Sequence, residues 1–159
     1  MNAKTYMTCG FAFMGLGNPG FEEVLLIQKN RPKWQAGKLN GIGGKAEASD
    51  GYIQDCMSRE FFEEAGLLIP SENWTWFMSC EYGRLNMVDY FAIELSPADF
   101  MLAHSKTDEK IVRVPVGFVH LYDILPNLHW IIPLARYTLL RDSMDSKIPR
   151  EYHVEVGLS

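Results

Sequence analysis

Three glutamates, Glu60, Glu63 and Glu64, stand close together in the chain. On a helix turning about 100° per residue, their side chains fall within a sector of about 100°, so three carboxylates share one face. Like charges at this spacing cost a helix roughly 0.2–0.5 kcal/mol per pair, and Arg59 is the only adjacent cation. A divalent cation would turn that cost into a gain. The donor set suits Mg²⁺, with Mn²⁺ as a substitute, and Mg²⁺ usually combines one or two carboxylates with substrate phosphate oxygens.

A glycine-rich segment precedes these glutamates. Gly43 and Gly44 would let the backbone approach phosphates closely, and Lys45 supplies a mobile positive charge. An arbitrary pair of neighbouring glutamates is usually just a solvated helix face. Here the acidic triplet directly follows the glycine segment, and the helix then ends at Gly66 before an apolar run. Both features favour a metal and phosphate site.

Residues 43–67, GGKAEASDGYIQDCMSREFFEEAGL, resemble the Nudix box. The matching positions are Gly44, Arg59, Glu60, Phe61, Glu63, Glu64, Gly66 and Leu67. The segment departs from the box in two ways: Asp50 stands where a glutamate is expected, and eight residues instead of seven separate it from Arg59. Asp50 is therefore a less secure orienting carboxylate than the box glutamate, and Glu47 is an alternative.

The resemblance implies a hydrolase in which a metal-activated water attacks phosphorus in a nucleoside triphosphate and releases a monophosphate and pyrophosphate. It assigns Glu60 and Glu64 as first-choice metal ligands, Glu63 as ligand or general base, and Arg59 as a member of the catalytic group. Gly44 joins the expected metal ligands. Family members often recruit another carboxylate from a distant loop, and Glu109 is the preferred candidate, with a solvated loop acid as the alternative.

The expected substrate-binding residues lie outside the acidic triplet. Asn40 and Lys45 lie in a segment that resembles MutT-like enzymes, where an asparagine reads the base; the alternative for Asn40 is to stabilise the following turn. Asn127 stands where those enzymes carry an acidic residue, and its amide can still hydrogen-bond a base. Trp130 either stacks on the base or packs in the core. Arg31 either holds distal phosphates or is solvated.

Two other readings stay open. Tyr82 lies near the place where dinucleoside-polyphosphate hydrolases of the family carry a tyrosine, so these compounds and ADP-ribose are alternative substrates. The altered spacing around Asp50 leaves room for a catalytically silent Nudix scaffold that only binds a nucleotide.

The elements needed to position these residues can be predicted from periodicity and turn chemistry. Strands are expected at residues 6–14, 23–28, 74–81, 85–95 and 111–119, and helices at residues 52–65, from 96 onward and at 131–141. Residues 15–20 are expected to form a turn, since they lead into a strand and not into the helix of a dinucleotide-binding motif.

Three further expectations concern single residues. Ser49 or Asp50 is expected to cap the helix at 52–65. Pro133 is expected to lie in the first turn of the helix at 131–141. Four side chains of the strand at 74–81 are expected to share one face: Trp74, Trp76, Met78 and Cys80.

These elements predict an α/β (α+β) fold, a Nudix-type α/β/α sandwich with a mixed, curved sheet between helices. The whole chain, residues 1–159, is expected to be one Nudix domain with its box at 44–67, and no role is predicted for the tail at about 145–159.

Bulk properties narrow the partners. A formal charge of -5 argues against non-specific nucleic-acid binding, and no apolar run approaches the roughly 20 residues of a membrane span. The three cysteines show neither a CxxC pair nor a disulfide framework, which favours the cytoplasm. A small nucleotide is the expected partner. The resemblance adds a homodimer as an open alternative.

Overall fold

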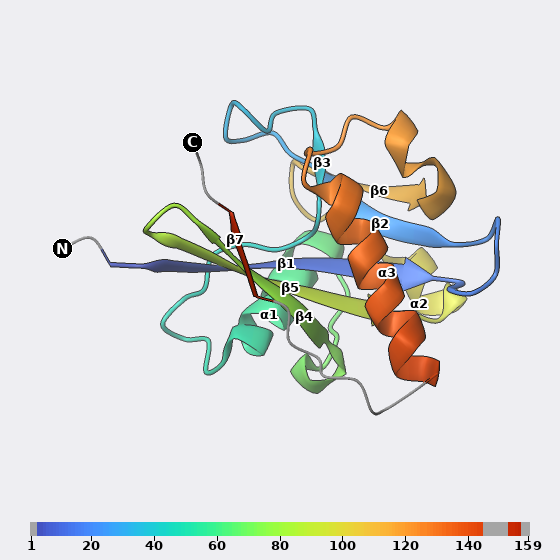
Figure 1. Cartoon of the computed structure of the whole chain (residues 1–159), viewed down its shortest axis with the longest axis horizontal. Coiled ribbons are helices and arrows are strands. Elements are labelled where there is room, and N and C mark those ends of the chain that lie inside the picture. The colour runs from blue at the N-terminus through green and yellow to red at the C-terminus, as the bar shows by residue number, and fades with distance from the viewer. Residues whose placement is uncertain (1–2, 145–152, 157–159) are drawn as a thin grey trace.

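The protein is a mixed β-sheet covered by helices on both faces, as predicted (Figure 1). The computed structural model describes residues 3–144 and 153–156. Their strands follow the order β3-β2-β1-β5-β4-β7, and β6 also pairs with β2, outside this order. The pairs β1–β5 and β4–β7 are parallel and the others are antiparallel. The strands are β1 (Thr5–Met14), β2 (Glu23–Gln28), β3 (Leu39–Asn40), β4 (Thr75–Tyr82), β5 (Asn86–Glu94), β6 (Lys110–Pro115) and β7 (His153–Val156).

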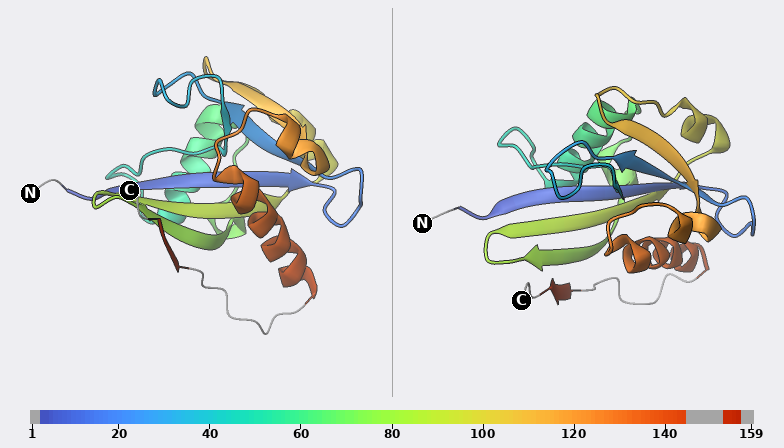
Figure 2. Two further views of the ribbon diagram at one scale, coloured as in Figure 1. Left: turned by 45° about the horizontal axis from the view of Figure 1, so that its top comes forward. Right: turned by 90° about the horizontal axis from the view of Figure 1, so that it is seen from above.

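The helices form two layers (Figure 2). They are α1 (Ile53–Ala65), α2 (Pro97–Leu102) and α3 (Leu128–Met144), with 3₁₀ turns at Ser71–Asn73 and Val116–Leu121. On one face, α1 and α2 bury Met57, Phe61 and Phe100 against the sheet. On the other face, α3 buries Leu128 and Ile131. The sheet therefore has an apolar core on each side.

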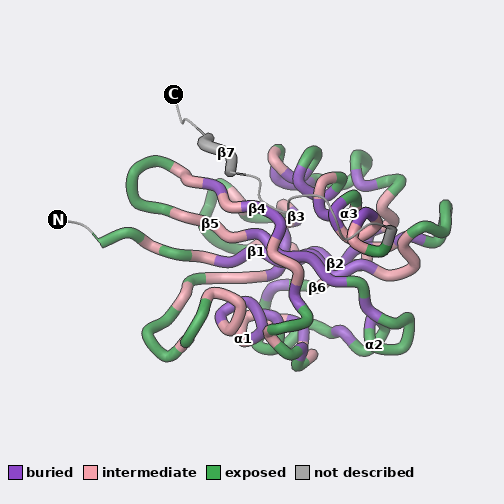
Figure 3. Tube along the Cα trace, turned by 60° about the horizontal axis from the view of Figure 1, so that its bottom comes forward, coloured by how far each residue is buried: buried purple, intermediate pink, exposed green. Residues whose placement is uncertain are grey.

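The centre of the sheet is more deeply buried than its ends (Figure 3). β1 is exposed or half-buried at Thr5–Met7, buried from Thr8 to Phe13 and half-buried again at Met14, and the loop that carries the glycines packs on its buried part. Thr8 N donates to Gly44 O at 2.8 Å, and Gly10 N donates to Ile42 O at 2.7 Å. These bonds fix the glycine loop between β1 and the acidic helix.

Several local predictions are confirmed. Residues 15–20 form the turn between antiparallel β1 and β2, which excludes the dinucleotide-binding alternative. Gly66 ends α1 in the left-handed conformation at φ 75°, where glycine carries no steric penalty. Ser96 caps α2 by accepting a hydrogen bond from Asp99 N.

The predicted cap of α1 is wrong. The N-cap is Tyr52, whose backbone N–H donates to Asp55 Oδ2 at 2.9 Å. Asp50 is engaged elsewhere, because it accepts from Glu47 N and from Arg59. The carboxylate that caps α1 is therefore that of Asp55 inside the first turn, and not one that precedes the helix.

The predicted common face of β4 is also wrong. The pairing with β5 shifts between Trp76 and Met78, which marks a β-bulge, so the alternation of side chains is broken there. Trp76 packs with the core under α1, whereas Met78 and Cys80 belong to the core under α3.

The end of the chain departs from the predictions in two places. The strand expected at 111–119 ends at Pro115 and continues as a 3₁₀ turn. α3 begins at Leu128, so Pro133 lies beyond its first turn. Within the tail for which no role was predicted, β7 pairs with β4; the rest of that tail lies outside the described residues.

No helix among the residues that the structure places is both long and apolar enough to span a membrane. All three cysteines are buried free thiols.

Candidate functional site

The acidic face of α1 turns toward the glycine loop. α1 is anchored by its apolar side, so its rotation is fixed and the glutamates project away from the sheet core. Glu60 is largely buried and Glu63 is half exposed, with side-chain exposures of 14% and 53%. Glu64 is intermediate between buried and exposed. The predicted grouping of the three carboxylates on one helix therefore exists, but each has a different environment.

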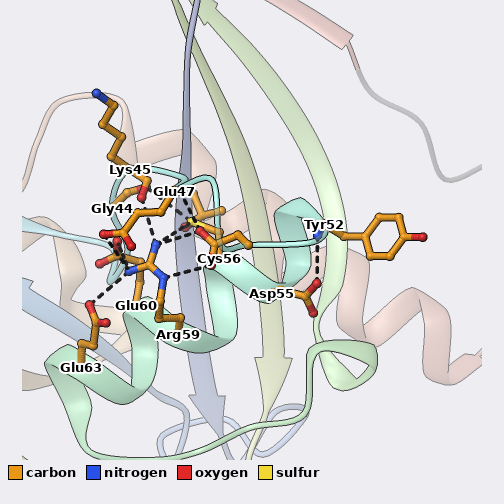
Figure 4. Close-up of polar contacts among 11 residues, drawn as sticks. Gly44, Lys45, Glu47, Tyr52, Asp55, Cys56, Arg59, Glu60 and Glu63 are labelled. Carbon is orange, nitrogen blue, oxygen red and sulfur yellow. Dashed lines mark hydrogen bonds and ion pairs between the residues drawn. The ribbon is translucent and has the colours of Figure 1, made fainter.

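Arg59 donates hydrogen bonds to several carboxylates of this region (Figure 4). Its Nε and Nη2 donate to Asp50 Oδ1 and Oδ2 at 3.0 and 2.9 Å, a bidentate pair. Its Nη1 donates to Glu60 Oε1 at 2.9 Å and to Glu63 Oε2 at 3.2 Å. The guanidinium thus ties the loop before the helix to two of the three glutamates.

Asp50 contacts Arg59 although one additional residue separates the two in the sequence. Hydrogen bonds from Arg59 hold the pKa of Asp50 below its usual range. Glu47, the alternative orienting carboxylate, is more exposed, and its Oε1 lies 4.0 Å from Arg59 Nη1. Asp50 is therefore the carboxylate that positions Arg59.

Gly44 creates space for a carboxylate. A methyl group at this position would lie 2.5 Å from Cδ of Glu60. At Gly43 it would lie 2.2 Å from the backbone oxygen of Thr8. Gly43 therefore permits the loop to pack on β1, and Gly44 permits Glu60 to pack on the loop.

The negative charge of the Glu64 carboxylate is stabilised by few hydrogen bonds. Among the described hydrogen bonds, it accepts one from Gly43 N at 3.1 Å. Burial raises the pKa of Glu64 to about 7, while the nearby charge of Lys29 opposes that shift. Burial likewise raises the pKa of Glu60, despite its hydrogen bond from Arg59.

Glu109 comes close to this region from a distant loop, and it brings a cation that the sequence did not reveal. Glu109 is 4% exposed, and its carboxylate accepts from Lys29 Nζ at 2.6 Å and from Asn30 N at 2.7 Å. Burial acts to raise the pKa of Glu109, but these hydrogen bonds hold it below its usual range. The charge of Glu109 also raises the pKa of Glu64. In the sequence, only the position of Lys29 directly after a predicted strand pointed to a role for this residue.

The carboxylates have the donor chemistry that Mg²⁺ requires. Within residues 3–144 and 153–156, no three His, Cys, Asp or Glu side chains form a ready-made cage. Glu60 and Glu64 offer two partly buried carboxylates whose charge is disfavoured by burial. This fits a magnesium ion that takes one or two carboxylates and completes its shell with phosphate oxygens and water.

The structure holds Asn40 in a defined orientation at the end of β3. Its Oδ1 accepts from Gly41 N at 2.8 Å, and Cys9 Sγ lies 3.8 Å from the same atom. Its Nδ2 lies 3.4 Å from Gln35 Oε1. The bond to Gly41 agrees with the turn-stabilising alternative, and Nδ2 has a second hydrogen besides the one directed to Gln35.

Asn127 and Trp130 lie at the start of α3. Asn127 Nδ2 donates to the hydroxyl of Tyr82 at 3.1 Å. Trp130 is 41% exposed, so it is not a core residue.

Arg31 and Lys45 are not drawn into the acidic group. Arg31 forms a bidentate pair with Asp108, and both side chains are exposed. Lys45 is exposed and points away from Arg59 and its carboxylates, although its backbone oxygen accepts from Arg59 Nη2 at 3.0 Å (Figure 4).

A shallow hollow lies on another side of α1. It is lined by Asp55, Ser58, Arg59, Phe62 and Leu68, with residues of the following turn. It shares Arg59 with the acidic face but none of the three glutamates, so the chemistry described above lies outside it.

Comparison with known proteins addresses the family directly. The model of the NUDIX domain matches residues 12–127. The NUDIX domain of Shewanella oneidensis NrtR, solved with ADP ribose, superimposes with a TM-score of 0.71 at 14% identity, covering 87% of this chain and 90% of that one.

Two further structures agree in fold. One comes from a study of MutT from Aliivibrio salmonicida and Vibrio cholerae, with a TM-score of 0.65, 17% identity and coverage of 84% of this chain and 98% of that one. The other is a NUDIX hydrolase from Nitrosomonas europaea, with a TM-score of 0.66, 15% identity and coverage of 98% and 81%. No curated protein matches the sequence. The family match spans most of the chain and includes the loop and helix described above, so this protein belongs to the Nudix family, whose domain implies hydrolysis of nucleoside diphosphate derivatives.

Proposed function

We propose that this protein is a magnesium-dependent Nudix hydrolase that cleaves a nucleoside triphosphate, ordinary or oxidised, to a nucleoside monophosphate and pyrophosphate. The observation that carries the proposal is the pair of undercompensated carboxylates, Glu60 and Glu64, beside the glycine loop. Two buried carboxylates with raised pKa values favour a divalent cation, and a triphosphate supplies the remaining oxygen ligands.

Each residue of the site has a role in this proposal. Glu60, Glu64 and the carbonyl of Gly44 would hold Mg²⁺, which when bound neutralises phosphate charge and lowers the pKa of water. Glu63, the most exposed of the three glutamates, serves as a further ligand or as general base.

Arg59 and Glu109 act from the flanks of that site. Arg59 orients Glu60 and Glu63 and is itself held by Asp50. Glu109 contributes a negative charge close to Glu64, with Lys29 as its counter-ion, and is the second-choice metal ligand.

A hydrolysis screen tests the proposal. Purified protein would be incubated with Mg²⁺ and ordinary or oxidised nucleoside triphosphates, dinucleoside polyphosphates and ADP-ribose, and the products separated by chromatography. We expect a triphosphate to be cleaved with release of pyrophosphate, and we expect this cleavage to require the metal. A Glu64→Gln variant prepared in parallel controls for contaminating hydrolases. Turnover that persists without metal, or undiminished in that variant, contradicts the proposal.

The second candidate is a nucleotide-binding scaffold without catalysis. It is favoured by the structural likeness to the NrtR domain that was solved with ADP ribose. Binding of ADP-ribose measured by calorimetry, with no cleavage over the whole panel, would select this candidate.

A further inference from the structure

Lys29 places a cation inside the acidic region of the protein. Its Nζ donates to Glu109 Oε2 at 2.6 Å, and its side chain is only 16% exposed. Burial raises the pKa of Glu64 to about 7, and the positive charge of Lys29 is the largest effect that opposes this shift. The ammonium group therefore offsets the charges of two carboxylates that come from different parts of the chain, α1 and the loop before β6.

The pairing of β2 with β6 fixes where this ammonium group lies. The two strands are antiparallel, and their register pairs Gln28 with Lys110. One step further along the same ladder, Lys29 and Glu109 are cross-strand neighbours, whose side chains lie within reach of each other. The backbone of Lys29 is also fixed, because its N–H donates to Lys38 O at 2.9 Å. The ion pair is thus set by the sheet and does not depend on a free loop.

Both carboxylate oxygens of Glu109 are engaged by protein donors. Oε2 accepts from Lys29, and Oε1 accepts from Asn30 N at 2.7 Å. The same segment holds the preceding residue, since Asn30 Nδ2 donates to the backbone oxygen of Asp108 at 3.0 Å and Arg31 pairs with its carboxylate. Glu109 is therefore held in place from both oxygens, and its charge is already compensated by Lys29.

A divalent ion bound between Glu64 and Glu109 would compete with Lys29. Magnesium binds carboxylate oxygens at about 2.0–2.1 Å, so such an ion would bring two positive charges next to the ammonium group. Like charges at short distance in a partly buried site repel strongly, because little water screens them. Glu64, in contrast to Glu109, accepts its described hydrogen bond from a neutral donor, Gly43 N, at 3.1 Å. Of the two carboxylates, Glu64 is the one left for a metal ion.

We propose that Lys29 is a built-in cation that takes the place of a second divalent metal ion between Glu64 and Glu109. The inference rests on the proposed magnesium-dependent function, and it goes beyond that function by setting the number of metal ions that the free protein binds. One Mg²⁺ is held by Glu60, Glu64 and the carbonyl of Gly44. Glu109 stays outside its coordination shell, paired with Lys29. Lys29 is accordingly a positioning residue, since it acts through the two carboxylates.

The test counts the Mn²⁺ ions bound to the full chain without nucleotide, by electron paramagnetic resonance of the unbound ion. Mn²⁺ takes the same oxygen ligands as Mg²⁺ and is detected directly. We expect one bound ion per chain for wild type and two for Lys29→Met, because the neutral side chain frees Glu109 to bind a second ion together with Glu64. Lys29→Arg keeps the positive charge and should bind one ion, as wild type does.

Lys4→Met is the matched control. Lys4 pairs with Glu81 of β4 at 2.9 Å, so this variant also removes a lysine from an ion pair, and it should leave the count at one. The double variant Lys29→Met with Glu109→Gln removes the carboxylate that the second ion needs, so its count should return to one. Thermal unfolding gives an independent readout, since Mn²⁺ should raise the Tm of Lys29→Met more than that of wild type.

Two Mn²⁺ ions bound to wild type, or a folded Lys29→Met that still binds one ion, would overturn the inference. A count of two in the double variant would do the same, because the second ion would then not need Glu109. The wild-type count requires no substitution, so the inference can be refuted even if Lys29→Met fails to fold.

The count of ions is measured separately from turnover, so the two proposals can fail independently. One bound ion in wild type and two in Lys29→Met, without hydrolysis of any nucleotide, would refute the proposed reaction and retain the role of Lys29. Metal-dependent hydrolysis by a wild type that binds two ions would do the reverse. Wild type that binds no Mn²⁺ would refute the proposed metal site and the inference together.

Discussion

The acidic face of α1 and the polar group of Tyr82, Tyr90 and Asn127 belong to opposite faces of one sheet, and they differ in how their polar atoms are satisfied. On the acidic face, Arg59 donates to Glu60 and Glu63, whereas Glu64 accepts from the backbone N–H of Gly43, so negative charge is in excess. In the second group, the hydroxyls of Tyr82 and Tyr90 lie 2.7 Å apart, and Asn127 Nδ2 donates to Tyr82.

The difference indicates which region calls for a cation. Excess charge at partly buried carboxylates is costly, and a multivalent cation relieves it with little demand on direction. The side chains of the second region hydrogen-bond one another and need no counter-ion. The first region therefore suits a divalent cation, and the second joins the start of α3 to β4 and β5.

The sharpest way to break this comparison is Glu64→Gln. The amide is nearly isosteric but a poor metal ligand, and changes in outer-shell partners alone cost about 10–100-fold. We expect turnover to fall more than about 100-fold, measured as magnesium-dependent pyrophosphate release. Glu72→Gln, an exposed glutamate outside the site, is the control and should keep the activity of the wild type. Activity of Glu64→Gln close to that of Glu72→Gln would mean that Glu64 does not hold the metal.

A substitution at Gly44 tests whether the loop positions Glu60. In Gly44→Ala the new methyl group displaces the movable end of Glu60, so magnesium affinity measured by calorimetry should fall about 10-fold with little loss of thermal stability. In Gly43→Ala the methyl group meets backbone, so we expect roughly 1–3 kcal/mol of destabilisation. Similar thermal shifts in both variants would argue against separate roles for the two glycines.

Asp50→Asn tests the positioning of Arg59. It keeps the shape of the side chain but loses the charge-assisted bidentate pair, and we expect kcat to fall about 10-fold. Glu47→Gln should lower kcat less than about 2-fold, because its contact with Arg59 is looser. A larger loss in Glu47→Gln than in Asp50→Asn would transfer the orienting role to Glu47.

The smallest expected effect is on the pH dependence of the free energy of unfolding. The pKa of Glu64 is about 7 in the folded protein, above its ordinary value of 4.5, so between these values the folded state binds more protons than the unfolded state. Stability in EDTA should therefore fall as pH rises from about 4.5 to 7, by roughly 1–3 kcal/mol from this group. Urea unfolding of wild type and Glu64→Gln across this range gives the contribution of Glu64 as the difference between them. Identical pH profiles would refute the raised pKa.

How well each region can be predicted from the sequence depends on how local it is. Glu60, Glu63 and Glu64 lie on one helix, so their periodicity alone places them on one face. The pairs Lys29–Glu109 and Tyr82–Asn127 join residues that are 80 and 45 positions apart, and no local pattern encodes such contacts.

The errors of prediction also have physical causes. Asp50 was expected to cap α1 because short acidic residues before a helix commonly do so, but the nearby guanidinium of Arg59 offers a stronger, bidentate partner. The side chains of β4 were assigned to one face on strict alternation, which a bulge breaks without any signal in hydrophobicity.

That bulge changes which core consecutive side chains of β4 enter. Trp76 packs in the core under α1, whereas Phe77, Met78 and Cys80 pack in the core under α3. An unbroken strand would send Phe77 and Met78 to opposite faces of the sheet. The bulge therefore adds one large apolar side chain to the core under α3 that strict alternation would have withheld from it.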